Sequence, residues 1–157
     1  MSLADFFGVG RQTAQQAVVS AVQTEPFEKK LYKDLDELAV YMRAHGNILP
    51  TSVYSRVRRI DDVLRPLLAF ITANGCSAEQ EHLLSSMITN YIPTPLKTFV
   101  SLPRADRADD GTPARLLNEQ FDTMLEKVYD LAGLVRKGAL EELAIHASFI
   151  DDKFSGA

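Results

Sequence analysis

The strongest constraint on this fold is a run of apolar residues that are spaced alternately four and three apart between residues 51 and 73. The run consists of Val53, Val57, Ile60, Leu64, Leu67 and Ile71. This spacing is typical of the seam of a helix that packs against other helices. It predicts one long helix at the centre of the fold, and Pro66 inside that helix predicts a kink.

Similar patterns before and after this run extend the prediction to most of the chain. A helix begins near Phe27, and Ser77 with Gln80 forms a capping-box pattern at the start of another. A long helix follows Pro113, with the apolar seam Leu117, Phe121, Met124, Val128, Leu131 and Val135. No stretch alternates with a period of two for long enough to demand a sheet. The chain is therefore predicted to be all-α, a helical bundle.

Three prolines interrupt the most apolar middle stretch, residues 90–104. We expect Pro93 to end the helix that begins at Ser77 and to push Ile92 toward extended geometry. Thr94 then caps a short helix, and Pro95 occupies its first turn, where a missing N–H costs nothing. Pro103 closes this short helix. The prediction is an elbow punctuated by proline within a helical fold.

The C-terminal apolar stripe changes phase after Val135, where Arg136, Lys137 and Gly138 form a helix-stop signature. We therefore expect the long C-terminal helix to be kinked or broken near Gly138. The second stripe has four large apolar residues, and these form the candidate interaction surface: Leu140, Leu143, Ile150 and Phe154. An exposed apolar face of this size favours association with a partner. The alternative is burial against the N-terminal helices of the same chain.

Length and charge limit the classes of function. The 157 residues suit one domain; we expect an N-terminal arm and short helix at 1–26 and a single helical-bundle domain at 27–157. Residues 1–104 carry 11 Lys and Arg against 10 Asp and Glu, and residues 105–157 carry 6 against 11. This balance lacks the basic face of a nucleic-acid binder. Without a secretory signal or a membrane-spanning run, we expect a cytoplasmic location.

The chain shows no motif for catalysis, cofactor binding or metal binding. The loop at 106–111 fails the calcium pattern, since Ala108 and Leu117 stand where oxygen ligands are required. The Glu79–His82 pair has no matching second pair for a di-iron site. Cys76 lies next to a helix start that could lower its pKa, but no base is paired with it in the sequence. We therefore assign no catalytic, cofactor-binding or metal-binding residue.

Three segments resemble XpaC-type proteins, which are named for hydrolysis of bromo-chloro-indolyl phosphate, and related actinobacterial helical proteins. The segments are ILPTSVYSRVRRIDDVLRPLL, ITNYIPTPLKTFVSLPR and ALEELAIHASFIDDKF. The resemblance covers roughly residues 49–154. In the second segment, the positions that match the elbow of these proteins are Tyr91, Pro93, Leu96, Leu102 and Pro103, with Ile92 in place of leucine. In the third, Phe149, Ile150 and Phe154 match their terminal helix. The resemblance implies a helical fold and a phosphoesterase-type hydrolase activity.

The function that these patterns favour is protein–protein interaction by a non-catalytic cytoplasmic domain. We expect either a homodimer or a different protein partner, and no cofactor, nucleic acid or membrane contact. Two alternatives stay open. One is the hydrolase activity that the resemblance implies. The other is peripheral membrane association through Leu3, Phe6 and Phe7, although docking of these residues on the chain itself is favoured.

Overall fold

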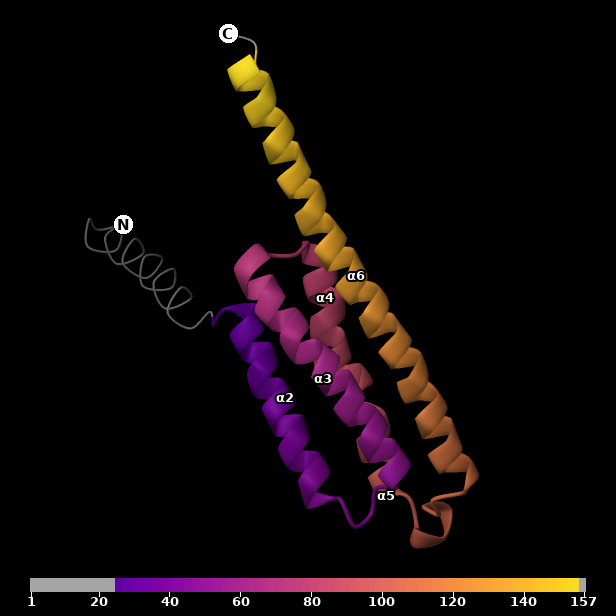
Figure 1. The fold of residues 1–157 in the computed structure, drawn as a ribbon. Coiled ribbons are helices and arrows are strands. Elements are labelled where there is room, and N and C mark those ends of the chain that lie inside the picture. Colours follow the sequence, from indigo (N-terminus) through magenta and orange to yellow (C-terminus); the bar gives the residue numbers. More distant parts are fainter. Residues whose placement is uncertain (1–24, 156–157) are drawn as a thin grey trace, which may run out of the picture.

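The structure is a computed structural model that describes residues 25–155, and all regular structure in this range is helical. In chain order the elements are α2 (Phe27–Ala44), α3 (Thr51–Asn74), α4 (Ala78–Ser86), a π-helical turn η1 (Met87–Tyr91), α5 (Pro93–Ser101), a 3₁₀ turn η2 (Arg104–Asp106) and α6 (Thr112–Ser155). Figure 1 shows α3 between α2 and α6. The all-α prediction is confirmed. The expected arm and its residues Leu3, Phe6 and Phe7 lie outside the described residues.

Helix α3 forms the centre of the core, as its apolar spacing predicts. All six residues of the seam are buried, and Ile60 and Leu64 have no exposed surface. The seam contacts α2 on one side and α6 on the other. Pro66 lies inside α3 without ending it. Both Pro66 and Asp62, whose carbonyl loses its usual donor, are exposed.

Polar contacts tie α3 to its two neighbours. The guanidinium of Arg56 donates to the Asp122 carboxylate of α6 at 2.8 Å. On the other side, Arg65 contacts Asp36 of α2 at 2.9 Å, and the Tyr32 hydroxyl donates to the Arg65 carbonyl at 3.0 Å. These contacts join residues far apart in the sequence and set how the three helices lie along one another.

The proline-rich segment is more continuously helical than expected. Ser77 and Gln80 form the predicted capping box. Ile92, however, has helical backbone angles (φ −85°, ψ −53°), and α5 begins at Pro93, so the expected extended Ile92 and the cap at Thr94 are wrong. The reason is η1, in which the Ile92 N–H donates to the Met87 carbonyl at 3.0 Å, five residues back. The wider π turn leaves room before Pro93 for a ring that a regular helix interior excludes.

The sequence predicts a kink or a break near Gly138; helix α6 runs without interruption through this residue, so the break is wrong. A glycine costs only about 1 kcal/mol in a helix, and nothing in the tertiary structure forces the chain to turn at this point. Val135 is the last buried residue, whereas the helix ends at Ser155, 20 residues later. At 1.5 Å per residue, this end of α6 extends about 30 Å beyond the core. Figure 1 shows it projecting from the body in yellow.

Candidate functional site

The four candidate residues lie on the projecting end of α6, on one face of the helix. Their side chains are largely exposed: Leu140 60%, Leu143 67%, Ile150 50% and Phe154 76%. With about 3.6 residues per turn, these positions and Ala147 form one stripe along the helix. We call this stripe the association face. Among the described residues, none of the helices of the body covers it.

Two more apolar residues of this segment lie on the opposite side of the helix. Ile145 is 70% exposed and Phe149 is 60% exposed. The Lys153 ammonium lies 5.8 Å from the centre of the Phe149 ring. The sequence analysis did not identify these two residues as a surface, because they are out of phase with the residues of the stripe. The signal that identifies it is simply a lack of polar residues at these two positions.

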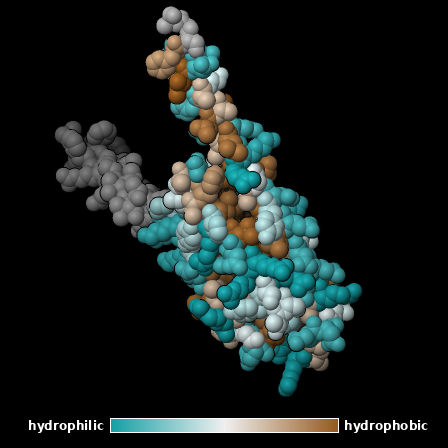
Figure 2. All heavy atoms as spheres, in the orientation of Figure 1, coloured by the Kyte–Doolittle hydropathy of each residue, from teal (hydrophilic) through white to brown (hydrophobic). Residues whose placement is uncertain are grey.

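The association face begins at an apolar hollow where α6 leaves the body. The hollow has a volume of about 570 Å³ and lies between the end of α3 and α6. It is lined by Phe70, Ala73 and Asn74 of α3 and by Arg136, Ala139, Leu140, Glu142, Leu143 and His146 of α6. Figure 2 shows hydrophobic side chains in brown where α6 leaves the body and along its projecting end. Leu140 and Leu143 thus belong to both the hollow and the stripe.

A second apolar groove, of about 890 Å³, runs between α6 and the α4–α5 segment. Tyr91, Leu116 and Leu134 line it and are 50%, 49% and 56% exposed. Tyr91 therefore lies beside α6 and is not a buried aromatic residue. Phe99 of α5 is buried, with 3% of its surface exposed.

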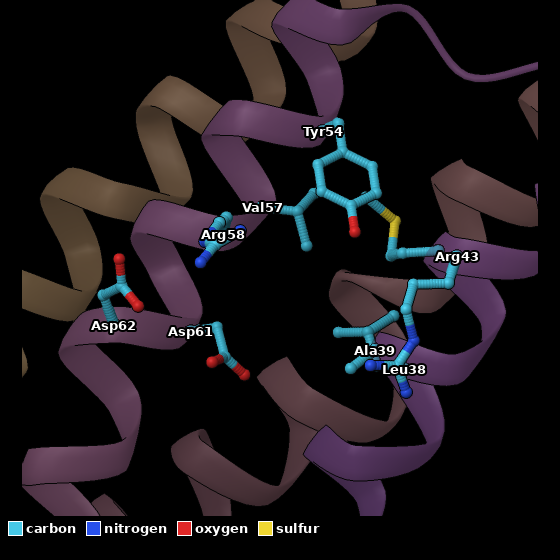
Figure 3. Close-up of a pocket in the computed structure, with 9 residues that line it drawn as sticks. Leu38, Ala39, Arg43, Tyr54, Val57, Arg58, Asp61 and Asp62 are labelled. Carbon is cyan, nitrogen blue, oxygen red and sulfur yellow. The ribbon is translucent and has the colours of Figure 1, made fainter. Parts of the chain in front are cut away.

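A smaller hollow of about 250 Å³ lies between α2 and α3. Figure 3 shows Arg43 and Arg58 on opposite sides of it, with Asp61 below. Asp61 is paired with Arg65 at 2.9 Å, and Asp62 also lines the hollow. The hollow is therefore lined by charges of both signs. It is also smaller than most ligand sites, which start at about 300 Å³.

The remaining candidate chemistry concerns Cys76 and metal ligands. Burial raises the pKa of the Cys76 thiol, and the negative charges of Glu81 and Glu28 raise it further. The lowered pKa suggested by the nearby helix start is therefore wrong. In the described part of the chain, no three His, Cys, Asp or Glu side chains are grouped closely enough to hold a metal ion. The hydrolase activity implied by the resemblance remains without an assigned catalytic residue.

Comparisons with known proteins add no relative to this picture. No family model, no curated protein and no solved structure matches the chain. Between residues 25 and 155, no helix combines the length and the apolar character needed to cross a membrane.

Proposed function

We propose that the protein acts by protein–protein association, with the projecting end of α6 as its binding element. The observation that carries this proposal is the exposure of the association face on a helix that leaves the core at Val135. Residues 140–154 are all exposed, yet the stripe keeps the apolar spacing of a packed helix. A helix that stays in water has no need of such a stripe.

The energetics favour a partner that buries the apolar stripe. Burying one side chain such as Leu143, Ile150 or Phe154 contributes about 1.5–3 kcal/mol when the side chain starts fully exposed. The side chains of the stripe are half to three-quarters exposed, so a large share of that gain is available at each. The ion pair of Lys137 with Glu141, at 3.9 Å, is exposed and contributes little. The apolar stripe is therefore the main source of binding energy on this segment.

The direct test is photo-crosslinking at the association face in the cells that make the protein. A photoreactive amino acid replaces Leu143 in the full chain, and the matched control places it at Glu126, an exposed position of α6 beside the body. We expect one adduct of discrete mass from position 143 and none from position 126. The absence of an adduct at position 143, or equal adducts at both positions, would contradict the proposal.

A further inference from the structure

We propose that the partner of the association face is a second copy of this chain, packed antiparallel along the projecting end of α6. This inference rests on the proposed function and names its partner. It is argued from the order of side chains and charges along residues 136–154. In this arrangement the two bodies lie at opposite ends of a helix pair.

The apolar stripe is self-complementary when the second helix runs in the opposite direction. The spacing of Leu140, Leu143, Ala147 and Ile150 places alternate residues at the two inward positions of a coiled coil. An antiparallel pair then sets Leu140 against Ile150 of the second copy, and Leu143 against Ala147. Twofold symmetry repeats both layers. Each layer joins apolar side chains, and the small Ala147 always meets the larger Leu143.

The charges that flank the stripe are arranged for the same pairing. Lys137 lies near the start of the segment and Asp151 near its end, at equivalent positions beside the stripe. The antiparallel register brings Lys137 of one copy opposite Asp151 of the other, twice in the dimer, in addition to the interaction that each already has within its own chain. A parallel pair instead holds these two residues about 21 Å apart along the axis, at 1.5 Å per residue. Charge order therefore distinguishes the two directions.

The same register places a side chain of the second copy at the apolar hollow where α6 leaves the body. It sets Phe154 of the second copy opposite Arg136, which lines the hollow together with Phe70 of α3. Phe154 is 76% exposed, the highest value among the large apolar residues of the described chain. An aromatic ring next to a guanidinium and an apolar wall gains both burial and a cation–π contact. A parallel pair leaves this hollow empty, because it holds both Phe154 residues far from the bodies.

The first test is crosslinking by a short bismaleimide in a Cys76→Ser background, at a concentration where light scattering shows dimer. Ala144→Cys places a thiol beside the symmetry axis, whereas Lys153→Cys places one more than about 20 Å from its copy along the helix axis. We expect crosslinked dimer from position 144 only. Crosslinking at both positions would indicate a parallel pair and overturn the antiparallel arrangement.

The second test is charge reversal with rescue. Lys137→Asp and Asp151→Lys should each weaken dimerisation by about tenfold, because each changes two attractive pairs into two repulsive ones. The double variant should return the dissociation constant close to its starting value. A double variant as weak as the single ones would overturn the pairing of Lys137 with Asp151.

The outcomes separate this inference from the proposed function. A photo-adduct at position 143 with twice the mass of the chain supports the second copy. An adduct of any other mass, together with a full chain that stays monomeric at high concentration, overturns the second copy but keeps the association face. The absence of an adduct at position 143 removes the proposed function, and the second copy with it.

Discussion

At the scale of single residues, burial decides which aromatic side chains hold the body together. Phe99 and Tyr91 belong to the same proline-rich segment, yet Phe99 is 3% exposed and Tyr91 is 50% exposed. Phe99 packs into the core, whereas Tyr91 lines the open groove beside α6. Their positions in the sequence do not reveal this difference, because each has an apolar residue three positions before it, as on one face of a helix.

Phe99→Ala should therefore destabilise the protein far more than Tyr91→Ala. Removing a buried Phe costs about 3–5 kcal/mol, since it leaves a cavity. Removing the half-exposed Tyr91 should cost no more than about 1 kcal/mol, since water fills the space. Denaturant unfolding of both variants measures the difference. Equal losses of stability would mean that Tyr91 is part of the core.

Cys76 should be a slow nucleophile in the folded protein. Its pKa is raised by burial and by the charges of Glu81 and Glu28, so the thiolate fraction at a given pH is smaller than in the unfolded chain. The pH profile of alkylation by iodoacetamide should have its midpoint at higher pH in the folded protein than in urea. Glu81→Gln should move that midpoint down. A folded midpoint below the unfolded one would contradict this account, and the comparison of midpoints separates it from simple steric protection.

At the scale of elements, α6 is one helix with two environments. Up to Val135 its seam packs against α3, and beyond it none of the described residues is buried. Gly138 lies just past this boundary, is exposed, and has open space where a Cβ would stand. The projecting end is therefore held by its own helical hydrogen bonds and by the packed turns before it, which remove the cost of starting a helix.

Substitutions at Gly138 should change the projecting end without changing the body. Gly138→Ala should stabilise this end by about 0.5–1 kcal/mol, seen as slower hydrogen exchange of amides after residue 138. Gly138→Pro should unfold the first turn beyond the body and abolish association. The denaturant midpoint of the body should stay the same in both. A large drop in that midpoint would show that residues after Gly138 contribute to the core.

Much of this element structure could be predicted from the sequence. The seam of α3 and the capping box of Ser77 and Gln80 depend on local spacing, and both were predicted correctly. The π turn before Pro93 could not be predicted, because the same residues are equally compatible with a helix that ends at Pro93 and a new helix capped by Thr94. The Arg56–Asp122 contact could not be predicted either, since it joins residues 66 positions apart.

The candidate site was predictable in part. The phase change after Val135 identifies Leu140, Leu143, Ile150 and Phe154, and the structure places all four on one exposed face. The break at Gly138 was predicted wrongly because Arg136, Lys137 and Gly138 form the same pattern at a true helix end. Whether the chain itself covers the stripe depends on where α6 leaves the core, and local spacing does not determine that point.

At the scale of the whole molecule, the protein is a small helical body with a long apolar helix end attached. The body buries most of its large apolar residues in one core, although Tyr91, Leu116 and Leu134 are about half exposed, and none of the described polar or charged residues is buried. The projecting end instead carries its large apolar residues outside that core. This contrast within one chain is the physical reason to expect a partner.

The most direct measurement is the mass in solution of the full chain and of two matched double variants, by light scattering across a range of concentrations. Leu143→Glu with Ile150→Glu places two charges on the association face, and Ile145→Glu with Phe149→Glu places two on the opposite face of the same helix. Circular dichroism should show all three proteins folded, since none of these residues is buried.

We predict that the unaltered chain and the opposite-face variant approach twice the chain mass of 17.4 kDa with increasing concentration, and that the association-face variant stays at the single-chain mass. An association-face variant that still doubles its mass would contradict the account, as would one that unfolds while the unaltered chain is a monomer.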